Sequence, residues 1–573
     1  MLYRGYIANC SDLIAEAEKR GEAQKQGIDG ELFAKAYRWW GEKLQLHVLG
    51  EYAVSIFDDQ CSSLFITHDS LGLVPLFYAQ QQDGILFASH LEDLVFLTGI
   101  NELDEEYLAD YLATAMVINP RTPFVNVCRL APGQSLHWIN GRPKLRTTWD
   151  LARIEPVVLS NDEEYEERFR TLLHEGVTAA LRTKGRIWCE LSGGLDSSTV
   201  TSVAARSGTR QFEAFSIIST RYRSEDEREW MKAVVNEYSL PWQTLDLDQS
   251  MPFSELPQGF HAEPISIEPA VGLLRRYKAL AESQGVHVVL TGLGGDGVLC
   301  GGSPRPYYLA DFLPFQLMRL SRALRDWREC NRERRSLTHL ILENVFRPLL
   351  MHLMGRNVQP FEYVLTPPWS HPDYLRARRL KKRSTYSLAP KCRSVGEHYH
   401  AERILNHGFA AGRGFDQGSC SFEFRNPILY RPLVEFMFAI PWEQKIRPNQ
   451  DRYLQRRALK GILPEPIRQR SDKGGGGQAY AEGLRKGNAW TELLLAHPRI
   501  VERGYVDANL WGEAVKRARF GVRSSMKDFL AAATLEVWLR QLEDFRRNLA
   551  TLTAHRDKDR MSGMGSVPIR SRF

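Results

Sequence analysis

A glycine-rich turn at residues 190–198 carries the strongest chemical signal in the chain, with the sequence Glu-Leu-Ser-Gly-Gly-Leu-Asp-Ser-Ser. It follows a strand predicted at 186–191 and leads into a helix predicted at 197–206. Two consecutive glycines let backbone N–H groups approach an anion, the serine hydroxyls add donors, and the helix start adds partial positive charge. The turn therefore predicts a phosphate-binding loop formed by Leu191, Ser192, Gly193, Gly194, Asp196, Ser197 and Ser198.

The carboxylate of Asp196 would repel a bare phosphate, but it suits a loop that holds Mg²⁺ against phosphate oxygens. A second glycine-rich turn, Thr-Gly-Leu-Gly-Gly-Asp-Gly at 291–297, follows another predicted strand. Parallel strands end at the same edge of a sheet, so both turns can face one crevice, where Asp196 and Asp296 would share the metal. Taken alone, the second turn is equally compatible with a plain loop. Its predicted binding residues are Gly292, Gly294, Gly295 and Asp296.

The elements around these turns predict an α/β protein. Strands alternate with helices from one turn to the other, in the pattern of a doubly wound parallel sheet. The predicted strands are 186–191, 212–218, 242–247 and 286–291, and the predicted helices are 161–181, 197–206, 225–238 and 271–283. Residues 1–150 instead predict an α+β domain of short strands joined by turns. Beyond residue 302 the chain is predicted to be mainly helical, with a last helix at 526–547.

The length and composition indicate a protein of several domains without a membrane span. The chain has 573 residues, of which 43% are hydrophobic and 25% charged, and it has no run of about 18 uncharged apolar residues. Eight cysteines are scattered without metal-ligand spacing, and the N-terminus lacks the pattern of a secretory signal, so we expect a cytoplasmic protein. The net charge of +6 gives no reason to expect nucleic acid as a partner.

Several motifs together resemble the synthetase domain of the asparagine synthetase family, which also includes β-lactam synthetases and lasso peptide cyclases. The phosphate loop matches the pyrophosphate loop of this family, and residues 425–436 and 454–474 resemble its helical signature. The resemblance implies ATP as substrate, Mg²⁺ as its metal, and adenine contacts from the strand at Phe215 and Ser216. It also implies that Lys473 stabilises charge on a reacting acyl-adenylate. A solvated surface lysine is the alternative.

The first 100 residues resemble the glutaminase domain of the same family. The matching runs are 30–41, 49–53, 68–78 and 87–89. The implied architecture is a glutaminase-like α+β sandwich at 1–155, an ATP-pyrophosphatase-type synthetase domain at 156–550, and a disordered tail at 551–573. Residues 303–420 match the family poorly and are expected to form a helical insertion.

Departures from the family narrow the expected activity. A glutaminase of this type needs a cysteine at position 2, where its α-amine serves as base, but this chain has Leu2, and Cys10 lies inside the chain. The first domain is therefore expected to be degenerate and to release no ammonia. Leu293 stands where relatives carry a glutamate, or a tyrosine that assists the amine. Gly297 replaces a glutamate, which we expect to loosen the turn or its metal geometry.

These departures predict a ligase whose amine comes from its own substrate, as in lasso peptide cyclases. Such an enzyme adenylates an Asp or Glu side chain of a precursor (core) peptide and joins it to the peptide's first amine as a macrolactam, releasing AMP and pyrophosphate. The resemblance implies a leader-binding protein and a leader protease as partners. The alternatives are another amide ligase of the family, for example one similar to β-lactam synthetases, and a nucleotide-binding scaffold without catalysis.

Weaker features lie in loops near the predicted crevice. Glu263 and Glu268, in an acidic segment after the third strand, are candidates for contact with the amine or for the general base, although exposed loop glutamates are common. The basic stretch 376–383 predicts a solvated helix face or, alternatively, a docking site for an acidic partner. The histidines show no metal-ligand spacing, so we expect no metal besides Mg²⁺.

Overall fold

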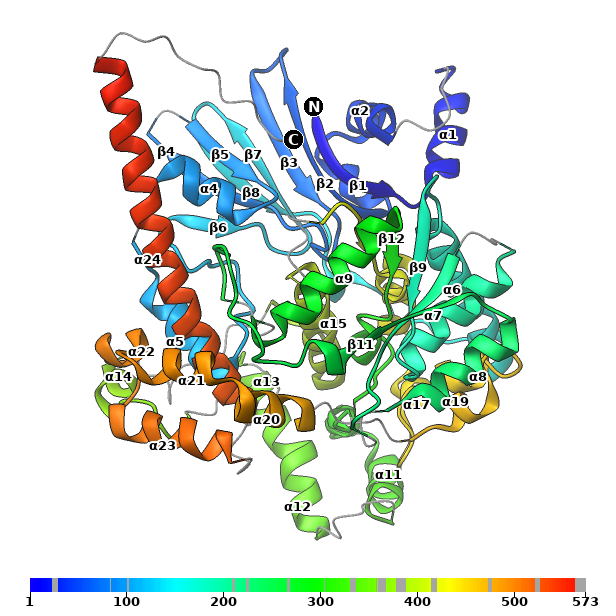
Figure 1. Ribbon diagram of the computed structural model, residues 1–573. Coiled ribbons are helices and arrows are strands. Elements are labelled where there is room, and N and C mark those ends of the chain that lie inside the picture. Colours follow the sequence, from blue (N-terminus) through cyan, green and yellow to red (C-terminus); the bar gives the residue numbers. More distant parts are fainter. Residues whose placement is uncertain are drawn as a thin grey trace.

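The structure, a computed structural model, builds its described part from three β-sheets flanked by helices (Figure 1). The described residues are 1–22, 29–82, 84–99, 102–208, 212–222, 226–264, 268–302, 304–329, 336–356, 358, 367–377, 388–413, 420–471 and 477–561, the last with a gap at 521–525. Within these ranges, no helix combines the length and apolar character that a bilayer span requires.

Two antiparallel sheets face each other in the N-terminal part. One has the strand order β1-β2-β3-β7-β8, the other β5-β4-β6. Ala53, Ile66 and Leu136 of the larger sheet pack against Tyr78 and Phe87 of the smaller one, which confirms the predicted α+β sandwich. The strands are β1 (Leu2–Ile7), β2 (Gly50–Asp58), β3 (Ser63–His68), β4 (Phe77–Gln81), β5 (Gly84–Ala88), β6 (Val127–Arg129), β7 (Gln134–Ile139) and β8 (Arg142–Thr147).

Helices cover the outer faces of this sandwich. Phe33 of α2 (Asp29–Trp40) packs on Tyr52 of the larger sheet, with α1 (Cys10–Lys19) and α3 (Leu44–His47) beside it. The smaller sheet carries α4 (Leu91–Thr98) and α5 (Glu105–Thr114). The start of α5 is fixed by Asp104, whose carboxylate accepts the N–H groups of Glu106 and Tyr107.

The third sheet is fully parallel, with the order β11-β10-β9-β12-β13. Its strands are β9 (Arg186–Glu190), β10 (Phe212–Ile218), β11 (Trp242–Asp246), β12 (Val286–Leu290) and β13 (Glu423–Arg425). Residues such as Ile187 and Cys189 pack on one face with α6 (Asp162–Ala180), α7 (Leu195–Arg206) and α8 (Arg228–Tyr238). Trp188 packs on the other face with α9 (Val271–Ser283). The predicted doubly wound sheet is confirmed, and its strand order reverses between β9 and β12.

A mainly helical segment separates β12 from β13. After the short α10 (Gly295–Val298) come η5 (Tyr307–Phe312), α11 (Leu317–Glu329), α12 (Leu337–Ile341), the π-helical η6 (Leu342–Phe346), α13 (Arg347–Leu353), α14 (Pro372–Ala377) and α15 (Val395–Arg413). The carboxylate of Asp311 fixes the start of α15 by accepting the N–H groups of Val395 and Gly396. The predicted helical insertion is therefore present.

The chain ends in helices, which are α16 (Arg431–Ala439), α17 (Trp442–Lys445), α18 (Tyr453–Ala458), α19 (Glu465–Gln469), α20 (Gly477–Lys486), α21 (Asn488–Leu495), α22 (Arg499–Glu502), α23 (Ala508–Arg519) and α24 (Met526–Met561). Helix α24 packs against α5 of the N-terminal part, with Trp538 beside Phe124 (Figure 1). Helix α24 continues to Met561, so the tail predicted from 551 begins inside this helix. Residues 562–573 lie outside the described part.

Candidate active site

The two glycine-rich turns lie at the carboxyl ends of β9 and β12, which are neighbours in the parallel sheet. They touch each other: a Cβ added at Gly292 would lie 2.6 Å from the backbone nitrogen of Ser197, and one at Gly295 would lie 2.2 Å from Cγ of Asp196. Both distances are too short for a side-chain carbon, so only glycine allows this contact. The structure therefore brings both turns to one edge of the sheet, at the point where the strand order reverses.

The phosphate loop is held open by its own serines. The N–H of Ser192 donates to Oγ of Ser197 at 3.1 Å, and the two hydroxyl oxygens lie 3.0 Å apart. Gly193 adopts a φ of +74°, and a Cβ there would lie 2.8 Å from Cβ of Trp230. Oγ of Ser198 is buried without a hydrogen-bond partner among the described residues. Backbone N–H groups at the start of α7 are the donors suited to an anion.

A guanidinium group joins the two predicted metal ligands. Arg452 donates from Nε to Oδ1 of Asp196 at 2.9 Å and from Nη2 to Oδ2 at 2.7 Å, and the same Nη2 binds Oδ1 of Asp296. Its Nη1 binds Asp451 at 3.0 Å. Burial lowers the pKa of Arg452, but Asp196, Asp296 and Asp451 together raise it above its ordinary value. The two carboxylates thus converge on one permanently charged cation.

Sequence reasoning missed Arg452. Arg452 and Asp196 are 256 residues apart, so no local sequence pattern predicts their contact. The structure marks Arg452 through its backbone conformation. Arg452 has a φ of 51°, which is uncommon for a residue with a side chain and marks a position that the surroundings enforce. This conformation places its guanidinium against Gly301, where an added Cβ would lie 2.0 Å from Cζ of Arg452.

A second set of side chains supports the phosphate loop from the C-terminal helices. Gln455 donates to Oγ1 of Thr199 at 2.9 Å, and Nη1 of Arg470 donates to the carbonyl of Gly193 at 3.0 Å. Nη1 of Arg456 binds the carbonyls of Arg468 and Arg470, at 2.7 and 2.9 Å. These contacts fix the backbone just before residues 472–476. The predicted catalytic Lys473 belongs to that segment and lies outside the described residues.

The predicted adenine strand keeps its side chains inside the protein. The ring of Phe215 stacks on Trp188 with centroids 4.2 Å apart, and Oγ of Ser216 donates to the carbonyl of Leu191 at 2.6 Å. The carbonyl of Phe215 accepts the N–H of Leu191 at 2.7 Å. Both residues therefore connect β10 to the start of the phosphate loop.

A carboxyl–phenol pair lies directly before the phosphate loop. Glu190 ends β9, and its Oε1 accepts the hydroxyl of Tyr277 on α9 at 3.2 Å. Burial raises the pKa of the Glu190 carboxyl to about 7, against the opposing effect of the hydrogen bond from Tyr277. A carboxyl group with this pKa can exchange a proton near neutral pH. Sequence reasoning did not select Glu190, although it stands next to the loop.

The turn that carries Asp296 is packed tightly against the insertion. Gly297 contacts α15, where an added Cβ would lie 2.7 Å from the carbonyl of Arg403. The guanidinium of Arg403 binds the carbonyls of Asp296 and Gly301, and Nε2 of His400 lies 3.2 Å from the carbonyl of Val298. The expectation that Gly297 loosens the turn is therefore wrong, because the missing side chain makes room for α15.

The structure also places Glu263, Glu268 and part of the basic stretch. The carboxylate of Glu263 pairs with the buried Arg129 of β6 and accepts the hydroxyl of Tyr107 at 3.2 Å, so both of its oxygens face the N-terminal sandwich. Glu268 begins the short helix η4 (Glu268–Ala270). Of the basic stretch 376–383, Arg376 pairs with Asp373 on α14, and residues 378–383 lie outside the described part.

Comparisons with known proteins agree with this geometry. The family model described as asparagine synthase matches residues 168–540, and the one described as a glutamine amidotransferase domain matches residues 1–149. The chain belongs to the asparagine synthase family. It is an asparagine synthetase-like, ATP-dependent carbon–nitrogen ligase.

Relatives of this asparagine synthase-family chain are distant. It is 22% identical over 482 residues to asparagine synthetase [glutamine-hydrolyzing] 3 of Bacillus subtilis, covering 82% of this chain and 74% of the relative. It is 27% identical to the amidase chyE of Penicillium rubens over 297 residues, or 48% of this chain and 43% of the relative. A solved NMN synthetase from Francisella tularensis overlaps 27% of this chain and 61% of its own, at 17% identity and a TM-score of 0.17.

In the N-terminal domain of this asparagine synthase-family ligase, the structure describes the surroundings of Leu2 and Cys10. Leu2 lies on β1 with 56% of its surface exposed. The Cys10 thiol is bound by the carbonyl of Ile7 at 3.3 Å and by Asp29 at 3.4 Å, and burial raises its pKa. A raised pKa disfavours the thiolate that attacks an amide. The Cys10 thiol is therefore poorly suited to act as a nucleophile.

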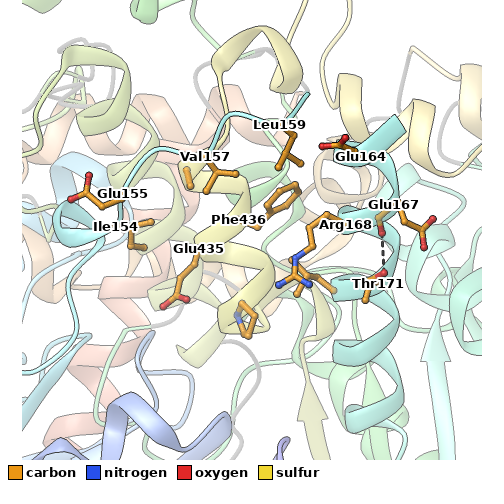
Figure 2. Close-up of a pocket in the computed structure, with 13 residues that line it drawn as sticks. Ile154, Glu155, Val157, Leu159, Glu164, Glu167, Arg168, Thr171, Glu435 and Phe436 are labelled. Carbon is orange, nitrogen blue, oxygen red and sulfur yellow. Dashed lines mark hydrogen bonds between the residues drawn. The ribbon is translucent and has the colours of Figure 1, made fainter. Parts of the chain in front are cut away.

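A cavity of about 630 Å³ lies apart from the two turns of this asparagine synthase-family ligase (Figure 2). It opens between the connecting segment with Ile154 and Val157, helix α6 with Arg168, and helix α16 with Phe436. None of the predicted site residues lines it. The cavity therefore lies between the connecting segment and helices α6 and α16, and not at the phosphate loop.

Proposed function

We propose that this ligase closes a peptide macrolactam. It activates the side-chain carboxylate of an Asp or Glu in a precursor peptide as an acyl-adenylate and joins it to the peptide's N-terminal amine, with AMP and pyrophosphate as products. A leader-binding protein and a leader protease prepare the peptide in this proposal.

The observations that carry the proposal are two glycine turns that meet at one sheet edge and a leucine at position 2, where a glutaminase of this type needs its cysteine. The two glycine turns meet and keep both aspartates, whereas Leu2 and Cys10 provide no N-terminal thiol. The amine must therefore come from solution or from the acid substrate itself. Leu293 is 43% exposed beside the Asp296 turn, and its apolar side chain can neither bind ammonium nor remove a proton. A tethered amine needs only positioning, which is worth about 7–11 kcal/mol in well-oriented intramolecular reactions.

The residues at the meeting point of the turns fit a magnesium ion. Asp196 and Asp296 offer the hard oxygen donors that Mg²⁺ prefers, and their convergence on Arg452 indicates that they can share one cation. Bound there, Mg²⁺ would withdraw negative charge from the phosphate oxygens of ATP.

In the first step, an oxygen of the substrate carboxylate forms a bond to the α-phosphorus of ATP as the bond to the pyrophosphate oxygen breaks. In this proposal, N–H groups at the start of α7 stabilise the departing charge, and the guanidinium of Arg452 adds positive charge beside Asp196 and Asp296. Lys473 is proposed to stabilise charge on the reacting adenylate.

In the second step, the amine nitrogen forms a bond to the acyl carbon, the bond to the AMP oxygen breaks, and one proton leaves the nitrogen. We assign this proton to Glu190, whose pKa near neutrality suits a general base. Tyr277 holds the carboxyl group through its hydroxyl. Glu263 is the less suitable acceptor because Arg129 and Tyr107 occupy both of its oxygens.

The test is incubation of the purified protein with ATP, Mg²⁺ and linear peptides that carry a free N-terminus and an internal Asp or Glu. The expected product has lost one water per molecule, and fragmentation locates an amide between the first residue and that side chain. An N-acetylated copy of the same peptide serves as the control and should release pyrophosphate without forming a ring. Conversion of the carboxylate to a primary amide in the presence of ammonium, without ring closure, would instead favour an ammonia-dependent ligase.

A further inference from the structure

The degenerate N-terminal domain is connected to the Asp296 turn by a buried chain of hydrogen bonds. Glu51 of β2 accepts the backbone N–H of Asn426 at 2.5 Å and its Nδ2 at 3.0 Å. Oδ1 of Asn426 accepts the hydroxyl of Thr291 at 2.7 Å, and that hydroxyl oxygen accepts the N–H of Leu293 at 3.1 Å. Thr291 and Leu293 open the turn that ends in Asp296. This series of hydrogen bonds therefore runs from the N-terminal sheet to the start of the turn that carries Asp296.

Every residue in this series of hydrogen bonds is buried except Leu293. Glu51 is 7% exposed, Asn426 2% and Thr291 1%. A buried network whose donors and acceptors are matched is rigid, and removal of one member leaves the next without a partner. The network is joined by Tyr6, whose hydroxyl donates to Glu51 and whose ring lies 4.1 Å from the guanidinium of Arg425.

A separate contact fastens the same two domains without reaching the turn. Arg431 at the start of α16 donates to the carbonyls of Gln45 and Leu46, at 2.6 and 2.7 Å, at the end of α3. This contact anchors the N-terminal domain as Glu51 does, but it has no hydrogen-bonded path to Thr291 among the described residues. Variants of Arg431 and Glu51 can therefore distinguish attachment of the N-terminal domain from positioning of the Asp296 turn.

We infer that Glu51 is a positioning residue for nucleotide binding, and that the N-terminal domain acts as a brace for the Asp296 turn. This inference rests on the proposed role of Asp296 in holding magnesium and ATP. It assigns the N-terminal domain a role that does not depend on glutaminase chemistry. The Arg-Asn-Pro motif at 425–427 is accounted for as well, because its asparagine is the link between the two domains.

The test measures the affinity of the full-length protein for MgATP without any peptide, by calorimetric titration well below the unfolding temperature. Glu51→Ala and Thr291→Val are each expected to weaken binding by about tenfold, a size usual for coupled sites. The double variant should bind no more weakly than the single variants, because both changes break one chain. Glu51→Gln keeps one acceptor oxygen and should lose less affinity for MgATP. It replaces Glu51→Ala in the measurement if that variant fails to fold.

Arg431→Ala is the matched control. It should lower the unfolding temperature by an amount similar to Glu51→Ala and leave the affinity for MgATP at the wild-type value. Wild-type affinity in the Glu51 and Thr291 variants, or an equal loss in Arg431→Ala, would overturn the inference. Failure of the proposed ring closure would not, because MgATP binding is measured without peptide. Absence of MgATP binding by the wild-type protein would overturn both.

Discussion

Asp196 and Asp296 share the guanidinium of Arg452, although they follow different strands and stand 100 residues apart in the chain. Two carboxylates brought this close repel each other, and a charge between them offsets that repulsion. The same convergence makes the pair a site for a divalent cation. Arg452 and a bound metal would therefore either compete for the same carboxylate oxygens or each bind some of the four.

Replacement of Arg452 by alanine should slow adenylation by about 10²- to 10³-fold, the loss typical of removing one preorganised donor from a developing charge. The measurement is pyrophosphate release with a peptide substrate at saturating ATP. Arg457→Ala is the control, because Arg457 lies on the same helix and pairs with Asp162. It should stay near the wild-type rate, and an equal loss in both variants would argue against a specific role for Arg452.

The Asp196→Asn variant distinguishes a catalytic protein from a nucleotide-binding scaffold. It keeps the shape of the side chain but removes the charge that binds Arg452, so we expect product formation to fall below detection. Product yield is followed by mass spectrometry. Unchanged yield would support a nucleotide-binding scaffold in which catalysis takes place elsewhere. Asp162→Asn removes an exposed carboxylate from the start of α6 and is the matched control.

The rate of ring closure should depend on the ionisation of Glu190. A general base acts when deprotonated, so the rate should rise with pH and level off above about 7. Glu190→Gln should lower the plateau and remove this rise. Tyr277→Phe removes a hydrogen bond that lowers the pKa of Glu190, so the rise should move to higher pH. Wild-type pH profiles in both variants would exclude Glu190 as the base. Single-turnover measurements keep product release from masking the effect.

Stability should fall as Glu51 ionises. Burial raises the pKa of Glu51 to about 7 in the folded protein, above its reference value of 4.5. The folded state therefore binds the proton more tightly than the unfolded state. The stabilisation linked to this proton is complete below pH 4.5 and is lost as the pH rises through about 7. The full effect approaches about 3 kcal/mol.

Urea unfolding of the wild-type protein and Glu51→Gln at pH 5 and pH 8 measures this effect. The difference in pH dependence between the two proteins reports Glu51 alone, because Glu190 titrates in both and its effect cancels. The wild-type protein should lose more stability than the variant between the two pH values. Parallel losses would assign the pH dependence to other groups.

Gly297→Ala should lower the free energy of unfolding by about 1–3 kcal/mol, because the added methyl group meets the carbonyl of Arg403. It should also weaken MgATP binding by shifting the Asp296 turn. Gly512→Ala in α23 is the control, since an added Cβ there meets nothing within 4 Å and alanine favours a helix. Unfolding by urea compares the two variants, and equal stability in both would contradict tight packing at Gly297.

The sequence predicted the regular elements well where their patterns were long. The bounds predicted for 212–218 and 271–283 coincide with those of β10 and α9. The short strand β13 was missed because three residues show no period, and its place is set by pairing with β12. The end of α24 was missed because polarity was taken as a sign of disorder.

The candidate site was predictable where one stretch of chain forms it, as in the phosphate loop. Arg452, Glu51 and Arg403 were not predictable in the same way, because each acts through a partner that only the fold brings near. The pKa of Glu190 likewise depends on burial beneath α9. Residue types alone therefore predicted the position of the phosphate loop. The side chains that hold the loop and set its charge could be identified only from the structure.

The packing of α15 on the Asp296 turn bears on how new substrate preferences could be introduced. The mainly helical segment between β12 and β13 would be a natural one to exchange between enzymes. Arg403 and His400 nevertheless belong to the nucleotide side of the molecule, because they hold the turn itself. A chimera that replaces the whole insertion would thus disturb ATP use, whereas one that ends before α15 would leave it intact.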